Sequence, residues 1–282
     1  MERRSALRAS LLALVLAMVA AADTAEEEPE WVLLATTTSV RDSGLLDELL
    51  PVFEEGSGIH VRVVAVGTGA ALRMGSHGDA DLLLTHAPPG EEALLASGAA
   101  LSRQPFMENY FVLAGPPEDP AGVRSADSPE EAYRRIARSG SPYVSRADDS
   151  GTHRREQALL LAAGLPEDAS FAGMVRTGAS MGITLQVAGE RRAYTLSDIG
   201  TFLAFEERTG LEVLSSPAPG LRNVYSVLAV SPRRFPGRIH ARAAERLAAF
   251  FLAPQTQHRI AAYGRERYGR PLFRPLRADP ES

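Results

Sequence analysis

The stretch Tyr143-Val-Ser-Arg-Ala-Asp-Asp-Ser-Gly-Thr-His153 changes from apolar residues to small and polar ones within one short segment, and residues 154–163 continue with the composition of a helix. This order predicts a strand, a tight turn and a helix start. The first turn of a helix has backbone N–H groups without partners and carries the positive end of the helix dipole, so residues 150–152 would form a cradle for an anion. Arg146 would add a fixed positive fork beside that cradle.

The same residues also fit a purely structural interpretation. Asp149 or Ser150 would cap the helix, and Arg146 would pair with Asp148 at the surface. For this stretch alone both interpretations stay open. A second cradle elsewhere in the chain would favour the anion site.

A second turn of this kind follows the apolar run at residues 31–35, which is typical of a buried parallel strand. The run leads into Thr36-Thr-Thr-Ser39, and leucines then recur at helical spacing up to Gly56. Ser39 and Asp42 resemble a capping box at the start of that helix. The hydroxyls therefore lie at a strand-to-helix turn, although a strand end followed by an ordinary helix cap would also account for them.

Glycine-rich and small-residue turns repeat the pattern. The β-branched residues 61–66 precede Gly67-Thr-Gly69, and Thr177-Gly-Ala-Ser-Met-Gly182 forms a turn with another pair of exposed backbone amides. Strands that alternate with helices predict right-handed βαβ units and a mostly parallel sheet. In such sheets ligands lie at the carboxyl ends of the strands, where these turns would meet.

Two stretches rich in proline and glycine predict crossings between two lobes. Residues 115–122 follow a strand at 110–114, and residues 215–223 precede a strand at 225–230. The predicted lobes are residues 31–114 plus 224–282, and residues 115–223.

Three further predictions concern local structure. Ser128-Pro-Glu-Glu131 has the pattern of a helix start with a serine cap, and Gly140 would end that helix. Thr195 and Asp198 resemble a capping box before another helix. Residues 265–282 are rich in arginine and proline and predict a tail of low order.

The first 22 residues have the features of a Sec-type signal peptide, with a basic start, an apolar run at residues 11–19 and small residues before Asp23. The apolar run is too short to span a membrane well. Residues 23–30 form an acidic leader without core residues. The chain has no cysteine for a disulfide or a lipid anchor, so we expect a free periplasmic protein.

Charge excludes several classes of function. Without residues 1–22 the chain carries 27 basic and 34 acidic residues, a net charge of −7, which argues against nucleic-acid binding. Attraction for an anion would therefore come from local dipoles and Arg146 rather than from the long-range field. The chain has no lysine, which excludes a lysine nucleophile or Schiff base.

An enzyme interpretation has one candidate pair, Ser150 with His153. At this spacing on one helix the imidazole would point along the turn rather than at the hydroxyl. The six histidines show no i, i+4 pairing, so we expect neither a metal cation site nor a cofactor, and no catalytic residues. A secreted hydrolase is the weaker alternative.

Seven short motifs carry a resemblance to a known family. They are Ala35-Thr-Thr-Thr-Ser39, Asp42-Ser-Gly-Leu-Leu46, Val66-Gly-Thr-Gly69, Gly78-Asp-Ala-Asp-Leu82, His86-Ala-Pro88, Ser145-Arg-Ala-Asp-Asp-Ser-Gly-Thr-His153 and Tyr194-Thr-Leu-Ser-Asp198. As a set they resemble the periplasmic tungstate-binding components of ABC transporters, over nearly the whole mature chain. The resemblance implies an α/β, type II periplasmic-binding-protein fold, in which each lobe is a mostly parallel sheet flanked by helices and the ligand lies in a cleft between the lobes.

The family also implies a function and a partner. A monomeric protein would capture tungstate, or molybdate, and deliver it to an inner-membrane permease. On the matching positions the resemblance implies Thr37, Thr38 or Ser39, Thr68, Arg146 and Thr152 as oxyanion contacts. With the small residues of the same turns, the candidate ligand-binding residues are Thr37, Thr38, Ser39, Thr68, Gly69, Arg146, Ser150, Gly151, Thr152, Ser180 and Met181.

The chain departs from the family pattern at three turns. Ala70 stands where glutamine is usual, Ala147 where glycine is usual, and Ala179-Ser180 where Gln-Gly is usual. These differences concern the choice among anions more than the class of ligand.

A phosphate- or sulfate-binding protein is the main alternative, because Arg146 and residues 150–152 also resemble the cradle of phosphate-binding proteins. Phosphate near neutral pH carries a proton and gains from a carboxylate acceptor, whereas tungstate and molybdate are fully deprotonated and would be repelled by one. Asp148 and Asp149 are therefore the discriminating residues. We expect Arg146 to point into the cleft, with one of these aspartates turned away to fix it or to cap the helix.

Overall fold

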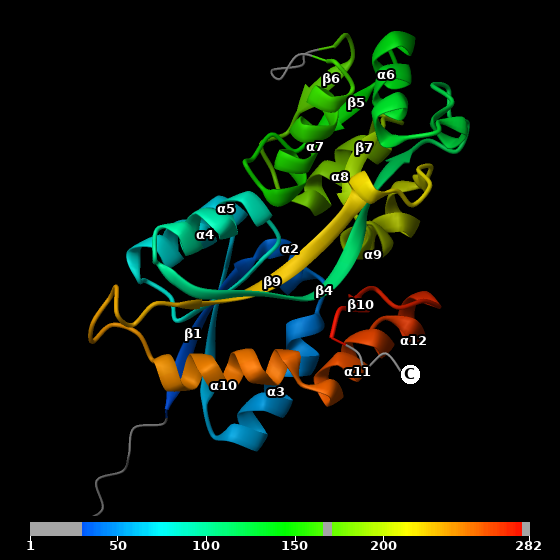
Figure 1. The fold of residues 1–282 in the computed structure, drawn as a ribbon. Helices are drawn as coiled ribbons and strands as arrows, with labels where there is room; N and C mark the ends of the chain where they lie inside the picture. The colour runs from blue at the N-terminus through cyan, green and yellow to red at the C-terminus, as the bar shows by residue number, and fades with distance from the viewer. Residues whose placement is uncertain (1–29, 166–170, 278–282) are drawn as a thin grey trace, which may run out of the picture. The chain divides into compact units, whose positions relative to one another are not determined.

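The computed structural model describes residues 30–165 and 171–277 (Figure 1). From Trp31 onward the described chain belongs to one compact unit. Within these ranges no helix has both the length and the apolar character needed to cross a membrane. The predicted signal peptide and nearly all of the acidic leader lie outside the described residues.

A mixed sheet forms the centre of this unit. β1 (Trp31–Thr37) pairs in parallel with β2 (His60–Val66) and with β3 (Leu82–Thr85). β9 (Arg222–Val230) is antiparallel to β3, and β4 (Ala100–Gly115) is antiparallel to β9. The predicted parallel arrangement thus holds for the first three strands, and the two long strands add antiparallel pairs.

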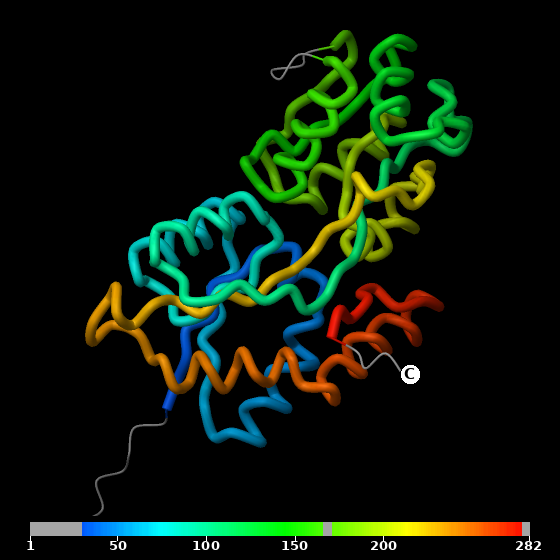
Figure 2. Tube along the Cα trace, viewed as in Figure 1, coloured from blue at the N-terminus to red at the C-terminus, as the bar shows by residue number. Residues whose placement is uncertain are grey.

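β4 and β9 run side by side and connect two groups of elements (Figure 2). From Phe111 onward β4 pairs with β7 (Thr195–Asp198) and β8 (Glu212–Val213) instead. β5 (Tyr143–Ser145) and β6 (Met174–Arg176) form a separate parallel pair. β4 therefore extends well beyond the predicted strand at residues 110–114, because it has different partners along its two halves.

The buried apolar side chains form clusters that follow the same division. Two clusters draw on residues 32–107 and 225–273, and two others draw on residues 111–221. The second half of β4, from Phe111 to Ala114, packs in the latter group, although we predicted it with the first lobe. The two-lobe division stays our proposal, with these clusters as its support.

Helices join the strands and cover the sheets. They are α2 (Thr38–Asp42), α3 (Leu45–Ser57), α4 (Thr68–His77), α5 (Pro88–Ala96), α6 (Pro129–Ser139), α7 (Gly151–Ala162), α8 (Met181–Glu190), α9 (Ile199–Thr209), α10 (Ala241–Leu252), α11 (Pro254–Ala262) and α12 (Arg265–Tyr268), with 3-10 turns at Val123–Ser125 and Pro219–Leu221. Each of α2, α4, α7 and α9 begins within a few residues of the end of a strand, as the strand-to-helix pattern predicts.

Two predicted capping boxes are wrong. Ser39 lies inside α2, and the N-cap is Thr37, which makes no side-chain cap bond. Thr195 lies in β7, and Asp198 is itself the N-cap of α9, where its Oδ1 accepts from Thr201 N at 2.9 Å. In both places the strand runs further than expected because it is held by a distant partner strand.

The predicted disorder after residue 264 is also wrong for the described residues. α12 and the short strand β10 (Arg274–Pro275) occupy this segment, and β10 pairs with β4. Leu272 and Phe273 are 2% and 3% exposed, and the Phe273 ring packs edge-on against Tyr225. Two apolar side chains are enough to fix a segment that is otherwise rich in arginine and proline.

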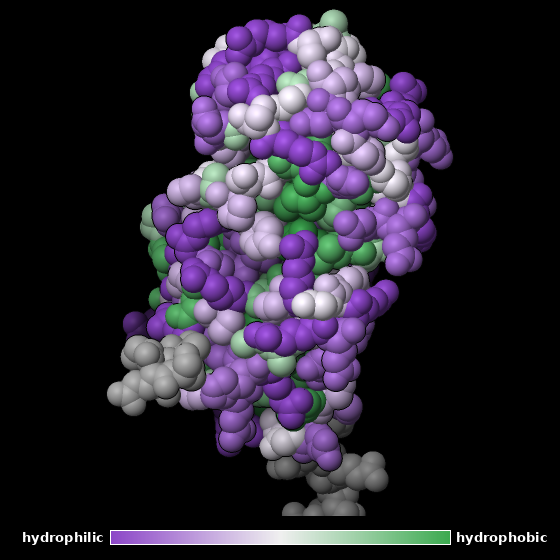
Figure 3. Space-filling model, turned by 90° about the vertical axis from the view of Figure 1, so that its right-hand side faces the viewer, coloured by the Kyte–Doolittle hydropathy of each residue, from purple (hydrophilic) through white to green (hydrophobic). Residues whose placement is uncertain are grey.

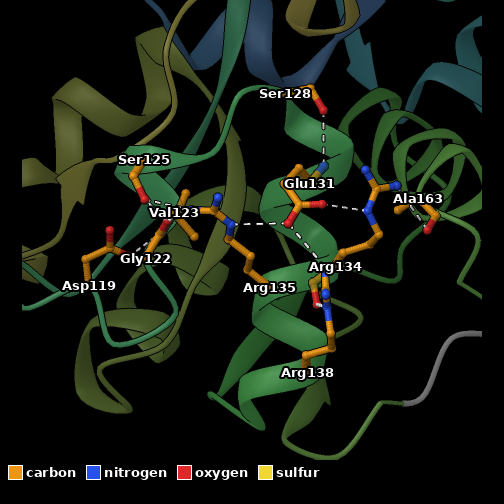
Figure 4. Close-up of polar contacts among 10 residues, drawn as sticks. All are labelled: Asp119, Gly122, Val123, Ser125, Ser128, Glu131, Arg134, Arg135, Arg138 and Ala163. Atoms are coloured by element: carbon orange, nitrogen blue, oxygen red, sulfur yellow. Dashed lines mark hydrogen bonds and ion pairs between the residues drawn. The ribbon is translucent and has the colours of Figure 1, made fainter.

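The predicted start of α6 is confirmed. Ser128 Oγ accepts from Glu131 N at 3.2 Å, Pro129 is the first helical residue, and Gly140 ends the helix in the left-handed region with φ of 67° (Figure 4). Glu131 in turn accepts from three arginines of the same helix, which lie on one face (Figure 4). The cap and these local ion pairs explain why this helix could be located from sequence alone.

Ser128→Ala should lower the free energy of unfolding by about 1 kcal/mol, because it removes the acceptor for an otherwise unpaired backbone N–H. Urea denaturation followed by circular dichroism measures this change. Ser216→Ala, at an exposed serine in a loop, is the matched control and should change little. Equal stability of the two variants would show that the cap does not contribute.

Candidate functional site

The turn after β1 gathers hydroxyl groups at the end of the sheet. Thr37 is the last residue of β1, and Ser39 lies in the first turn of α2. Their side-chain oxygens are 3.1 Å apart, and both residues are buried. Thr38, the first residue of α2, is half-buried between them. One turn therefore brings three of the predicted hydroxyls together.

Thr68 lies in the neighbouring turn. Thr37 is opposite Val66 in the parallel pair of β1 and β2, and Thr68 begins α4 two residues after Val66. Thr68 is 1% exposed, and its Oγ1 has no hydrogen-bond partner among the described residues. A buried polar group without a partner costs roughly 1–3 kcal/mol. We therefore expect a bound ligand to supply the acceptor for this hydroxyl.

Arg146 follows β5 and is only 5% exposed. Its Nη2 donates to Asp148 Oδ2, and Asp148 Oδ1 accepts from Ser150 N at 3.2 Å. Its Nε has no hydrogen-bond partner within the described ranges. The expectation that an aspartate fixes the arginine is confirmed. The structural interpretation is confirmed in the pair of Arg146 with Asp148, but its placement at the surface is wrong, because the guanidinium is buried.

The start of α7 has the predicted cap. Ser150 Oγ accepts from His153 N at 3.3 Å, and Gly151 and Thr152 of the first turn are buried. His153 Nδ1 accepts from Asp149 N at 3.1 Å, so the imidazole is not directed at the Ser150 hydroxyl. This geometry gives the hydrolase alternative no nucleophile–base contact.

Gly69 brings the starts of α4 and α7 close together. A Cβ atom at Gly69 would lie 3.0 Å from Asp149 Oδ2 and 2.9 Å from Arg154 Nη2. Asp149 itself is paired with Arg154, which lowers the pKa of its carboxyl group. Thr68, the neighbour of Gly69, therefore lies near the loop that carries Arg146, and the predicted turns converge.

The turn before α8 is tied to Arg146 through a residue that we did not predict. Thr177 Oγ1 lies 3.3 Å from Arg146 O and 3.2 Å from Ser145 O. Met181 is buried in an apolar cluster, and Ser180 is exposed and makes no side-chain cap bond. The assignment of Ser180 and Met181 to the ligand stays a prediction.

His86 is a buried residue that sequence reasoning did not place in the site, although the His86-Ala-Pro88 motif contains it. Its Nδ1 is 2.8 Å from Asn223 Oδ1. Burial lowers the pKa of His86 to about 4, and the nearby Arg146 and Arg155 act in the same direction. His86 is therefore neutral near pH 7, and its ring contacts the start of α7 at Gly151.

Three more polar residues from distant strands complete the surroundings. Tyr225 OH accepts from Asn223 Nδ2 at 2.8 Å, and Asn223 Nδ2 also donates to Asn109 Oδ1. Asp198, which is 2% exposed, has a pKa raised by burial, and Arg146 opposes that rise. Each carboxylate oxygen of Asp198 accepts a hydrogen bond from Thr201.

A cavity of about 740 Å³ has walls that include residues 108–110, 217–219 and the C-terminal residues 270–275. None of the predicted site residues lines it. Figure 3 shows the face that carries the C-terminal segment, with an apolar area in its middle. The buried donors, and not this open cavity, mark the candidate anion site.

Comparisons with known proteins agree with the geometry. Residues 20–255 match a family model described as a PBP superfamily domain. The tungstate-binding protein TupA of Peptoclostridium acidaminophilum is 40% identical over 274 residues, which is 94% of this chain and 94% of that protein. The chain belongs to the TupA family within the PBP superfamily.

Solved structures of the TupA family have the same fold. The tungstate-binding protein TupA from Desulfovibrio alaskensis G20 is 37% identical with a TM-score of 0.78, covering 89% of this chain and 100% of that one. The tungstate ABC transporter protein from Geobacter sulfurreducens is 39% identical with a TM-score of 0.75, covering 83% and 99%. The predicted type II periplasmic-binding-protein fold is confirmed.

The loop between β5 and α7 has two residues other than glycine in the left-handed region. Ala147 adopts a φ of 48°, and Asp149 adopts a φ of 57°. Residues other than glycine pay roughly 1–2 kcal/mol for this left-handed conformation. The anion loop is therefore held in a strained form by its contacts, above all the bonds of Asp148 to Arg146 and to Ser150 N.

Gly151→Ala should destabilise the protein, because a Cβ atom there would overlap the His86 ring. The ring is buried and bonded to Asn223, so it has little room to move. Overpacking of this kind costs typically about 1–3 kcal/mol. Urea denaturation measures the loss.

Gly67→Ala is the control for this substitution. Gly67 has a φ of −64°, and a Cβ atom there meets nothing within 4 Å. A stable Gly151→Ala protein with unchanged tungstate binding would contradict the close approach of His86 to α7.

Proposed function

We propose that this protein binds tungstate in the periplasm and delivers it to the permease of an ABC transporter. The observation that carries the proposal is the pair of buried donors, Thr68 Oγ1 and Arg146 Nε, that have no partner among the described residues. They come from turns that converge at the starts of α4 and α7. The ligand named in its relatives, tungstate, has four oxygens that accept hydrogen bonds and carries two negative charges.

The nearby carboxylates favour a fully deprotonated anion. Asp148 is used by Arg146 and Ser150, Asp149 by Arg154, and Asp198 by Thr201. In these contacts all three acids accept hydrogen bonds from the protein. A phosphate that keeps a proton would therefore compete with these bonds for an acceptor, which costs a bond and the desolvation of both groups.

Isothermal titration of the purified chain with tungstate, molybdate, sulfate and phosphate tests the proposal. We expect tungstate and molybdate to bind and phosphate not to compete with them. A ligand at 100 times its Kd should stabilise the native state by roughly 2.7 kcal/mol and so raise the melting temperature. Binding of phosphate or sulfate with no effect of tungstate would make the alternative correct.

The remaining parts of the proposal concern the cell. We infer a secreted monomer that is processed after residue 22, acts without a cofactor and binds its ligand without converting it. The permease is the expected partner. Cell fractionation and N-terminal sequencing of the mature protein test this, and a product retained in the cytoplasm with its first 22 residues would contradict it.

A further inference from the structure

Asn109 is a third buried donor without a hydrogen-bond partner in the part of the chain that the structure describes. It lies on β4 and is 4% exposed. Its Oδ1 accepts from Asn223 Nδ2 at 2.8 Å, but its own Nδ2 has no hydrogen-bond partner among the described residues. An amide N–H group that is buried in this way is costly unless something else accepts from it.

A chain of hydrogen bonds links this amide to His86. His86 Nδ1 lies 2.8 Å from Asn223 Oδ1, and the ring donates there when Nδ1 carries the proton of the neutral imidazole. The Asn223 NH₂ group then donates to Asn109 Oδ1 and to Tyr225 OH, both at 2.8 Å. In this tautomer Asn109 accepts through Oδ1 and keeps its NH₂ group for another acceptor.

Several contacts place this amide beside the proposed anion site. Asn109 and Asn223 are paired residues of β4 and β9. The Tyr225 hydroxyl, which lies next to both, also interacts with the side chain of Ser39. Two residues beyond Asn109, Phe111 is paired with Asp198, whose carboxylate is close enough to Arg146 to be stabilised by it.

Tyr225 is a second neutral polar residue at this place. Its hydroxyl oxygen accepts from Asn223 Nδ2, and the hydroxyl also interacts with the side chains of Asn109 and Ser39. Burial raises the pKa of Tyr225, so the hydroxyl keeps its proton throughout the neutral range. The two strands therefore place two neutral polar side chains, Asn109 and Tyr225, next to Ser39.

We propose that Asn109 Nδ2 and Tyr225 OH donate hydrogen bonds to the bound oxyanion and that they select a fully deprotonated anion. This inference rests on the proposed function. An amide NH₂ group matches an oxygen of tungstate, but it cannot accept from the O–H of hydrogen phosphate.

Titration of four single variants with tungstate and phosphate tests the inference. Asn109→Ala and Tyr225→Phe should each weaken tungstate binding about 10- to 100-fold, as expected for the loss of one hydrogen bond to a charged group. Asn109→Asp replaces the donor by an acceptor of the same shape, so it should lose tungstate and raise the ratio of phosphate to tungstate affinity.

Ser226→Ala is the matched control. Ser226 lies on β9 with a buried Oγ that also has no partner among the described residues. Because it follows Tyr225 on the strand, its side chain lies on the opposite face of the sheet. It should bind tungstate as wild type does. Melting temperatures without ligand identify any variant that fails to fold, and Asn109→Ala and Tyr225→Phe then carry the test.

The outcomes separate the two proposals. Wild-type protein that does not bind tungstate would refute the proposed function. Wild-type protein that binds tungstate, with folded Asn109→Ala and Tyr225→Phe variants that bind it as tightly as Ser226→Ala does, would refute the role of the strand donors alone. An Asn109→Asp protein with an unchanged ratio of phosphate to tungstate affinity would refute the selection.

Discussion

Arg146→Glu should abolish tungstate binding. The guanidinium is buried, with Nη2 held by Asp148 and Nε without a partner among the described residues. A glutamate in its place would set a buried negative charge against a dianion, and a like-charge contact of this kind costs several kcal/mol, roughly. Isothermal titration that gives a full binding curve for wild type should show no binding heat for the variant.

Arg146→Lys separates geometry from charge. An ammonium group keeps the charge but cannot copy the planar fork that bonds Asp148 and still offers Nε to a ligand. The loss of one charge-assisted bond costs roughly 1.5–3 kcal/mol, or about 10- to 150-fold in affinity. Thr152→Ala should cost less, because neighbouring backbone amides remain.

Arg138→Glu is the control for charge reversal. Arg138 is exposed and pairs with Glu131 on α6, so its reversal should leave binding unchanged. If folded Arg146→Glu bound tungstate with wild-type affinity, the cradle at the start of α7 would be only a helix cap, and the anion site would lie elsewhere in the chain.

Local signals explain the parts of the fold that could be predicted from the sequence. The caps at Ser128 and Ser150 depend on residues within three positions of each other, so their pattern is complete in the sequence. The strand-to-helix turns that carry Thr68 and Arg146 are local in the same way. Thr68 and Arg146 were both predicted to contact the ligand, and each has a buried donor without a partner within residues 30–165 and 171–277.

Long-range partners explain the errors. The extent of β1 is set by β2, and that of β7 is set by Phe111 and its neighbours on β4, so the capping boxes proposed at Ser39 and Thr195 had to fail. The order of the C-terminal segment depends in the same way on the contact of Phe273 with Tyr225. The sequence of these segments alone contains no pattern that identifies their distant partner strands.

The polar residues around the site were missed for the same reason. His86 and Asn223 are 137 positions apart in the chain, and Asn109 and Asn223 are 114 apart. Each is an isolated polar residue in a strand or loop when the sequence is considered alone. The pairing of β3, β9 and β4 brings them together, and His86 is near enough to Arg146 to be affected by its charge.

Glu156 should make the stability of the fold depend on pH. It lies on α7, is 3% exposed, and accepts from Tyr143 OH at 2.7 Å and from Ser145 Oγ. Burial raises its pKa from 4.5 to about 7, although the two hydrogen bonds and Arg176 act in the opposite direction. The folded state thus favours the protonated acid, and this contribution is complete below pH 4.5 and is lost as the pH rises to about 7.

His86 has the opposite effect. Burial lowers its pKa from 6.5 to about 4, so the folded state favours the neutral ring. Its contribution is complete above pH 6.5 and is lost as the pH falls toward 4. Between pH 4.5 and 6.5 the two groups therefore oppose each other, and the free energy of unfolding of the wild type should change little on their account.

Glu156→Gln should remove the contribution of Glu156 to the pH dependence of the free energy of unfolding. The amide still offers an oxygen to Ser145 or Tyr143 but does not titrate, so the variant avoids the cost of a buried carboxylate at pH 8. A rise of the pKa from 4.5 to about 7 corresponds to roughly 3 kcal/mol, which is the upper limit of the expected stabilisation at that pH. Urea denaturation at several pH values measures it, with Glu55→Gln at an exposed position of α3 as the control.

The shape of the pH profile is the sharper part of the expected result for Glu156→Gln. With His86 acting alone, the free energy of unfolding of the variant should rise steadily between pH 4 and 6.5, where wild type and Glu55→Gln stay nearly level. Above pH 7 the variant and the wild type should run parallel, because neither group titrates there in the folded state. Profiles of the same shape for all three proteins would mean that Glu156 is ionised in the fold throughout, and that Tyr143 and Ser145 stabilise a carboxylate rather than an acid.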